Sequence, residues 1–428
     1  MPGRFRWVVV LLLFSATIIN YIDRSAIAFA ANEIQSQFGL NASQLGFILG
    51  AFGVGYIIST LFGGIAVDRF GSRISLAVCL FVWSLAIGWT GAATGFVMLY
   101  AARAVLGLAE GPSFPTLTSA ITKWLPPEER ATALGGALVA VPIALAIGSP
   151  LVSLLLEAFG WRSMFFTLCV CGLLWLPFWL YFFADEPAQS ALVSNQERLY
   201  IETSQRGVNA PKPRHTPTSK EWRILLNNPT LRANYWAYFV FGYYIFFFMS
   251  WMPKYLRDSF NLDLSQVGYF AFMPWALAAV LLLAFGRWSD AILKRTSNLR
   301  KARSYQIAGT QLFAAIAIIP ASFIDNLYVA IVSITLAVGA TMAANAAYYA
   351  VVTDLVPRLA GTAMGIMTIW FAASGFLAPV ITGYALNLSG SFAPAFWLLS
   401  LLGLSSVLGV VLFHNPDLDR GTLLRKMA

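Results

Sequence analysis

The sequence has little charge and almost no histidine or cysteine. Only 11% of its 428 residues are Asp, Glu, Lys or Arg, whereas 58% are hydrophobic. The 2 histidines and 3 cysteines show no metal-ligand spacing, and Cys79, Cys169 and Cys171 lie in apolar runs, where cysteine is normally a packing residue. We therefore expect no metal, no cofactor and no disulfide or redox role.

Long apolar runs fill most of the chain. Runs of about 20 residues match the roughly 30 Å hydrocarbon thickness of a bilayer, which excludes a soluble domain. Such runs must be helical in lipid, because a helix satisfies its own backbone hydrogen bonds. The sequence thus predicts an all-α membrane protein with twelve transmembrane helices, near residues 7–31, 43–67, 74–93, 96–122, 131–157, 162–183, 232–253, 266–288, 304–323, 326–352, 362–387 and 392–413.

The basic residues are distributed unevenly about these spans. Most Lys and Arg fall in the two tails and in alternate loops, whereas the loops of the opposite side hold only Arg162, Lys254 and Arg257. By the positive-inside rule, both termini are expected in the cytoplasm, for a multi-pass protein of a bacterial inner membrane. Topology thereby explains the net charge of +9, so we expect no nucleic-acid partner.

One long polar segment divides the chain into two related halves. We expect an N-terminal six-helix bundle at 1–183, a cytoplasmic linker at 184–231 and a C-terminal six-helix bundle with a short tail at 232–428. The run LPPEERATALG, which begins at residue 125, shares five residues with LVPRLAGTAMG, which begins at residue 355. Two halves in the same orientation are typical of a rocking transporter whose site lies between them.

The loop between the second and third spans reads GGIAVDRFGSR, and GRWSDAILKR is a degenerate second copy in the other half. Glycine permits a tight turn between two helices, and the acid and bases can pair across helix ends and latch one conformation. The stretch resembles the signature loop of the major facilitator superfamily. Together with a basic residue of the repeated run, it gives the predicted gate: Gly64, Asp68, Arg69, Gly71, Arg73 and Arg130.

Four charged residues occur inside two spans: Asp23 and Arg24 in the first, Arg103 and Glu110 in the fourth. Each costs several kcal/mol at membrane depth unless it faces a partner or a watery cavity. Arg103 and Glu110 share one helix face, two turns apart. Their depths suggest that Asp23 pairs with Arg103 and leaves Arg24 free for another group.

These residue types suit transport of an anion. Arginine keeps its proton and matches a carboxylate with two parallel hydrogen bonds, so it is a natural anion receptor. A carboxyl group in a poorly hydrated cavity can load and release protons as access alternates. The structural alternative is an ion-pair cluster that only fixes helix packing, although buried pairs stabilise little.

The resemblance becomes more specific at five runs: NYIDR from residue 20, RAVLGLAEGPSFP from 103, KWLPPEER from 123, NNPTLRANYW from 227 and SWMPKYL from 250. They resemble the anion:cation symporter family within that superfamily, which includes bacterial aldonate, hexuronate and glucarate permeases and the vesicular glutamate and sialic acid carriers. The resemblance implies the major facilitator fold and proton-driven uptake of an organic anion. It also implies that Asp23 and Glu110 carry protons, while Arg24 and Arg103 bind substrate or switch conformation.

The C-terminal half departs from the sugar-acid pattern, because its core spans contain many aromatics and few polar groups. Such a lining suits a substrate with few hydroxyls or a flat apolar body, although aromatics at these positions are often packing or lipid-facing residues. With Arg24 and Arg103, the substrate-binding candidates are Tyr21, Tyr56, Tyr243, Tyr244, Asn345, Tyr349, Trp370 and Ser374.

Of the function classes considered, proton-coupled uptake of a small carboxylate such as a sugar acid is the leading one. Its expected partners are the organic anion, protons and the lipid bilayer, and we expect a monomer. Import or export of a larger polycarboxylate, such as a carboxylate siderophore, and a membrane sensor without flux remain alternatives. An enzyme is not expected, because no HExxH or similar set occurs, and a channel would need repeated polar rings.

Overall fold

The computed structural model describes residues 3–205 and 217–420, which contain helices and no strand. Short turns of other helix types lie at Pro187–Gln189, Arg300–Ser304 and Ile319–Ser322. The α-helices are α1 (Phe5–Phe29), α2 (Ala31–Phe38), α3 (Ala42–Gly91), α4 (Phe96–Glu110), α5 (Ser113–Trp124), α6 (Pro127–Phe182), α7 (Asn195–Gln205), α8 (Ser219–Asn227), α9 (Pro229–Phe260), α10 (Leu264–Thr296), α11 (Tyr305–Ala317), α12 (Leu327–Ala343), α13 (Asn345–Leu355), α14 (Ala360–Ser389) and α15 (Ala393–Phe413).

Kinks and breaks relate these helices to the twelve expected crossings. Gly71 (φ 79°) and Gly160 (φ 76°) adopt left-handed backbone that favours glycine, so α3 and α6 each cross twice. Pro112 lacks an N–H to continue the helix, and the fourth crossing is split there into α4 and α5. The tenth crossing is split at Ala344 into α12 and α13.

Length and hydropathy single out nine segments of the described residues as candidate membrane spans. One of them, α6, contains two crossings. The segments that fall outside the nine are the α4–α5 crossing, which is broken beside Glu110, and α9, which carries Arg232, Lys254 and Arg257. With 15 and 12 residues, α4 and α5 are each too short to cross a membrane alone. The expected all-α architecture of twelve spans is confirmed.

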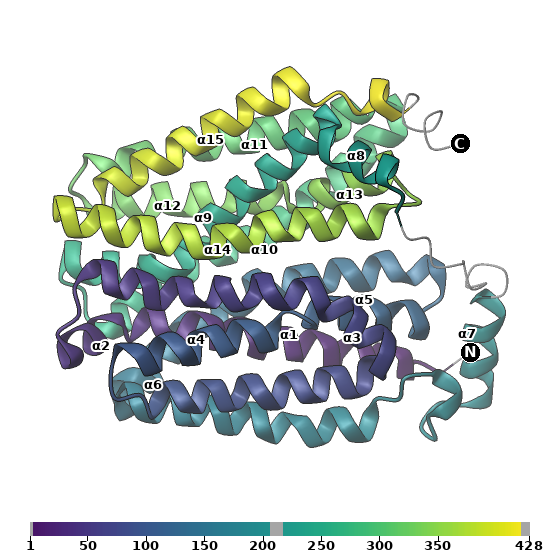
Figure 1. Cartoon of the computed structure of the whole chain (residues 1–428), viewed down its shortest axis with the longest axis horizontal. Helices are drawn as coiled ribbons and strands as arrows, with labels where there is room; N and C mark the ends of the chain where they lie inside the picture. The colour runs from purple at the N-terminus through teal and green to yellow at the C-terminus, as the bar shows by residue number, and fades with distance from the viewer. Residues whose placement is uncertain (1–2, 206–216, 421–428) are drawn as a thin grey trace.

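Figure 1 shows two layers of helices, α1–α6 in purple to blue and α9–α15 in teal to yellow. Both chain ends lie at one end of the molecule beside α7 and α8, called the termini face here. The opposite end, which carries α2, is called the α2 face.

The two halves touch closely near the α2 face along α3 and α14. A Cβ added at Gly46 of α3 would lie 2.7 Å from the carbonyl oxygen of Pro379, and one at Gly53 would strike the backbone of Phe376. Gly365 lies about three turns before Phe376 on the same face of α14. A Cβ at Gly365 would meet nothing within 4 Å among the described residues.

Gly64 of α3 and Gly361 of α14 behave as Gly365 does, with nothing within 4 Å of an added Cβ in the described structure. Helix faces that interlock at the α2 face therefore separate toward the termini face. The halves are closed at one end of their interface and apart at the other.

Polar contacts also join the halves at the α2 face. Glu33 of α2 pairs with Arg257 of α9 at 2.7 Å. The Asn32 amide donates to Asp258 at 2.8 Å and accepts from Lys254 at 3.1 Å, while Lys254 pairs with Asp258 at 2.8 Å. We call Asn32, Glu33, Lys254, Arg257 and Asp258 the α2-face latch.

The predicted gate residues Gly71 and Arg73 lie at the termini face and contact their own half. Gly71 turns the chain beside Asp185, whose carboxylate accepts the backbone N–H of Arg73 at 3.0 Å. The guanidinium of Arg73 donates to the carbonyl of Leu180. These contacts tie the turn of α3 to the end of α6.

The other gate residues lie on α3 and α6. Asp68 is exposed, and Arg69 lies over the ring of Phe70 at 5.5 Å. Arg130 donates to the carbonyls of Leu125 at 3.0 Å and Thr122 at 2.7 Å, which caps the end of α5. The role of the six residues as a gate stays a prediction.

Candidate functional site

An arginine and a glutamate from different helices meet inside the N-terminal half. Arg24 of α1 donates to Oε2 of Glu110 through Nε at 2.9 Å and Nη2 at 2.6 Å. Their side chains are 3% and 0% exposed, and Asn20, one turn earlier on α1, accepts from Nη2 at 3.2 Å. Nη1 of Arg24 and Oε1 of Glu110 have no hydrogen-bond partner in the described structure. The pair thus keeps an unused donor and an unused acceptor.

Arg103 adds a second buried cation beside this pair. Its Nη2 donates to the carbonyl of Arg24 at 3.2 Å, while its Nε and Nη1 have no partner among the described residues. Two buried guanidinium groups thus keep unused N–H donors, and both lie beside the ring of Phe52. Unsatisfied buried donors are costly, and at a functional site they indicate a ligand or water.

The expected ion pair between Asp23 and Arg103 is wrong: no hydrogen bond or ion pair joins them in the described structure. Arg24 pairs with Glu110 instead. Asp23 is 1% exposed, and its Oδ2 has no partner among the described residues. Asp23 lies close enough to Glu110 for the two carboxyl groups to interact electrostatically.

Aromatic rings surround the Arg24 guanidinium. Its Cζ lies 4.4 Å from the ring centre of Phe52, 4.5 Å from Tyr21 and 5.2 Å from Tyr56. Such cation–π contacts favour the charged guanidinium where water is scarce. Tyr21 and Tyr56, both predicted as binding residues, are therefore brought to Arg24.

The C-terminal half presents another aromatic group to this region. The hydroxyls of Tyr238 and Tyr349 are 2.7 Å apart, and both tyrosines lie within electrostatic range of Tyr21 in the other half. Phe114 of α5 stacks on Tyr349 at 6.0 Å across the interface. Tyr349, a predicted binding residue, therefore lies at the interface between the halves, and Tyr238 is a further candidate that the sequence analysis missed.

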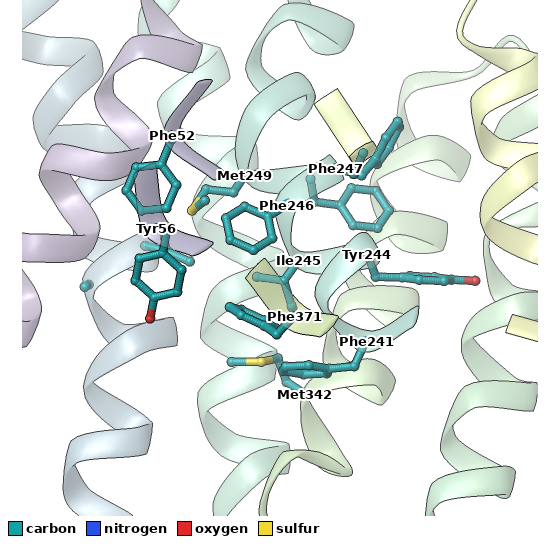
Figure 2. Packing of buried hydrophobic residues seen from close by; sticks show 14 of the residues in the cluster. Phe52, Tyr56, Phe241, Tyr244, Ile245, Phe246, Phe247, Met249, Met342 and Phe371 are labelled. Atoms are coloured by element: carbon teal, nitrogen blue, oxygen red, sulfur yellow. The ribbon is translucent and has the colours of Figure 1, made fainter. Parts of the chain in front are cut away.

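Ring contacts continue from Arg24 to Tyr238. Phe52 stacks on Tyr56 at 5.4 Å and lies 6.3 Å from Phe246, which lies 5.1 Å from Phe371. Phe371 lies 5.4 Å from Tyr238. Figure 2 shows Phe52 and Tyr56 on one helix, with Phe246 and Phe371 across from them. We call Phe52, Phe246, Phe371, Tyr238 and Tyr349 the aromatic wall.

The helical spacing of α9 contained a signal for this wall. Tyr238, Phe241, Ile245 and Met249 recur every three or four residues and so share one face. The ring contact of α9 with Phe52 of the N-terminal half is made by Phe246, the residue after Ile245. The neighbouring Tyr243 and Tyr244 lie on other faces of the same helix.

Several predicted binding residues lie away from Arg24. Tyr244 donates to the carbonyl of Leu399 on α15 at 2.8 Å and points away from Phe52 in Figure 2. Tyr243 is buried with Phe239 as a ring neighbour at 6.2 Å. Trp370 is 41% exposed, and Ser374 donates to the carbonyl of Phe371 on its own helix. These four residues are not brought together with Arg24.

Asn345 begins α13 one turn before Tyr349, so both lie on the same helix face. It is 6% exposed, and its side-chain oxygen has no partner among the described residues. Asn345 thus offers one available amide beside the Tyr238–Tyr349 pair.

Comparisons with known proteins identify the family of the chain. The family model described as Major Facilitator Superfamily matches residues 13–379. The chain is 32% identical to the hexuronate transporter of Bacillus subtilis over 96% of this chain and 95% of the relative. It is 33% identical to a probable sulfoacetate transporter of Cupriavidus necator over 93% of this chain and 91% of the relative.

Solved structures with low sequence identity share the fold. A bacterial homologue of the lysosomal transporter Spinster, inward-facing and unoccupied, matches with a TM-score of 0.74 at 18% identity over 100% of this chain and 99% of that one. A D-xylose–proton symporter matches with a TM-score of 0.73 at 15% identity over 96% and 98%. The resemblance inferred from the motifs is confirmed: the chain belongs to the Major Facilitator Superfamily and is a membrane transporter, not an enzyme.

Proposed function

We propose that this transporter is a proton-coupled symporter that takes up a small organic anion across a bacterial inner membrane, with the termini face in the cytoplasm. The observation that carries the proposal is the pair of buried guanidinium groups, Arg24 and Arg103, with unused donors beside one paired acid. The named relatives, which transport hexuronate or, probably, sulfoacetate, support an anionic substrate.

The anion binds at the unused N–H groups of Arg24 and Arg103. A carboxylate there gains charge-assisted hydrogen bonds that are stronger than neutral ones. The rings of Tyr21, Phe52 and Tyr56 keep water from the guanidinium of Arg24, and the low local dielectric strengthens the attraction.

Charge balance links the anion to a proton. Two arginines and two ionised acids would be neutral together, so the site would hold no excess charge for an anion. Asp23 is buried without a partner in the described structure, and protonation removes the cost of its charge. With one of the two acids neutral, Asp23 or Glu110, one positive charge is in excess and a single carboxylate balances it. Anion and proton therefore bind together.

In this proposal, the separated termini face is the route by which the buried site reaches one side of the membrane. The α2-face latch and the α3–α14 contact close the other side. In this proposal the halves rock about the Arg24 region, so that the α2 face opens as the termini face closes. The structure then corresponds to the cytoplasm-open state.

Transport by purified protein in proteoliposomes tests the proposal. A thermal-shift screen against uronates, aldonates, aromatic acids and citrate-like anions first identifies a bound anion. Uptake of that labelled anion is then followed with and without an inward proton gradient. We expect accumulation only with the gradient, together with proton entry. Equal accumulation after the gradient is collapsed would exclude proton coupling.

A further inference from the structure

We infer that the substrate is a carboxylate carried on a flat aromatic ring with few hydroxyl groups, and that the aromatic wall selects it. This inference rests on the proposed function, because it assumes that Arg24 and Arg103 receive the carboxylate. It concerns what lies beyond the carboxylate, on the side of the C-terminal half.

Several hydroxyl groups of the C-terminal half already have partners, whereas those of Tyr235, Tyr243, Thr335, Thr382 and Ser406 have none in the described structure. Tyr348 accepts from Gln311 at 2.7 Å. The side chains of Thr341 and Thr368 donate to carbonyls of their own helices at 2.7 and 2.8 Å. Tyr238 and Tyr349 bond to each other. The amide oxygens of Gln311 and Asn345 lack a partner in the described structure, and that of Asn345 lies one turn before Tyr349.

A sugar acid carries several hydroxyls, each of which loses water on entering the site. A hydroxyl left without a partner costs about 1–3 kcal/mol. Apart from the mutually bonded hydroxyls of Tyr238 and Tyr349, the aromatic wall offers ring faces instead of donors and acceptors. Several unpaired hydroxyls would outweigh the gain from the arginines, so a polyhydroxylated body fits this face poorly.

A planar ring fits the same face well. The wall has ring-centre spacings of 5.1 to 6.3 Å between Phe52, Phe246, Phe371 and Tyr238, within the range of aromatic pairs. A flat substrate ring can stack on these rings while its carboxylate reaches Arg24. The Tyr238–Tyr349 pair and Asn345 can accommodate one polar ring substituent.

Binding to purified full-length protein in detergent tests this, because aromatic acids cross lipid unaided and would obscure uptake. The affinities of benzoate and 4-hydroxybenzoate are compared with those of glucuronate and galactonate. Acetate, which has only a methyl group beside its carboxylate, reports on the charged site alone. We expect the aromatic probes to bind at least tenfold more tightly than the sugar acids. A sugar acid that binds more tightly than both aromatic probes would overturn the inference and leave the proposed function standing.

Variants separate the wall from the charged site. Phe371→Leu should weaken benzoate binding about three- to tenfold, because one aromatic contact is lost, and should leave acetate binding unchanged. Phe313→Leu, at a residue that is 51% exposed on α11, is the matched control and should change neither. Unchanged benzoate binding in both Phe371→Leu and Phe246→Leu would overturn the role of the wall. If no carboxylate binds wild-type protein, the proposed function fails as well.

Discussion

Arg24 and Glu110, 86 positions apart in the chain, form a buried ion pair in which one carboxylate oxygen receives both Nε and Nη2. The second oxygen of Glu110 and the Nη1 group of Arg24 stay without partners in the described structure. In the proposed function, an anion can bind the unused Nη1 group of Arg24 first and then compete with Glu110 for Nε and Nη2. Such competition would link anion binding to the charge state of Glu110.

Glu110→Gln is expected to abolish gradient-driven accumulation while counterflow of labelled substrate continues. Glutamine keeps the shape of the side chain but cannot exchange a proton. Both activities are measured in the same proteoliposomes, with Glu157→Gln, at an exposed position of α6, as the control. Loss of counterflow with substrate binding intact would contradict a role limited to proton coupling.

Arg24→Lys is expected to weaken anion binding by about tenfold to a hundredfold, the loss of one or two charge-assisted hydrogen bonds. A lysine ammonium is a point charge and cannot hold Glu110 and an anion in the planar geometry of a guanidinium. Calorimetric titration of the purified variant measures the affinity. Arg223→Lys, on the exposed surface of α8, should bind as wild type does. An unchanged affinity in Arg24→Lys would remove Arg24 from the site.

Gly53→Ala and Gly365→Ala are expected to differ in stability. At Gly53 the new methyl group would strike the backbone of Phe376, and overpacking of this kind costs about 1–3 kcal/mol. At Gly365 it meets nothing within 4 Å in the described structure, and alanine favours the helix by up to about 1 kcal/mol. Thermal unfolding in detergent should show a lower Tm only for Gly53→Ala. Equal losses would argue against the closed α2 face.

Glu33→Arg is expected to weaken the α2-face latch, because it places two like charges at the contact with Arg257. A partly exposed pair contributes up to about 1 kcal/mol, so the open and closed populations should shift by up to about fivefold. Spin labels on α2 and α9 report the distance between the halves. The double variant Glu33→Arg with Arg257→Glu restores opposite charges and should recover the wild-type distance distribution. A distribution that stays shifted in the double variant would show that this ion pair does not hold the two halves together.

His414 predicts a pH dependence of stability. It follows α15, its Nδ1 lies 2.7 Å from the Ser304 hydroxyl, and burial lowers the pKa of the imidazole from 6.5 to about 3. Below pH 6.5 His414 becomes protonated in the unfolded chain but stays neutral in the folded chain. Its contribution to the free energy of unfolding is therefore fully present above pH 6.5 and is lost as the pH falls toward 3. From pH 7 to 5 the loss is about 2 kcal/mol.

The free energies of unfolding of wild type and His414→Gln, measured at several pH values, test this pH dependence. The difference in stability between the two proteins should shrink or change sign in favour of the variant as the pH falls from 7 to 5. A difference that is constant over this range would show that His414 titrates normally in the folded protein.

The amino-acid sequence determined the membrane architecture. Its apolar runs predicted twelve crossings, since lipid leaves a long apolar segment little choice but a helix. Spacing also predicted which residues share a helix face, such as Arg103 and Glu110. These are local properties, which depend on residues close together in the chain.

Only the tertiary structure decided how those faces meet. Asp23 and Arg24 are neighbours in the sequence, yet Arg24 pairs with Glu110 while Asp23 is left without a partner in the described structure. Likewise Tyr244 turns toward α15, whereas Tyr238 reaches Tyr349. Periodicity gives the angle between side chains on one helix, but the rotation of that helix against its neighbours depends on packing across the whole bundle.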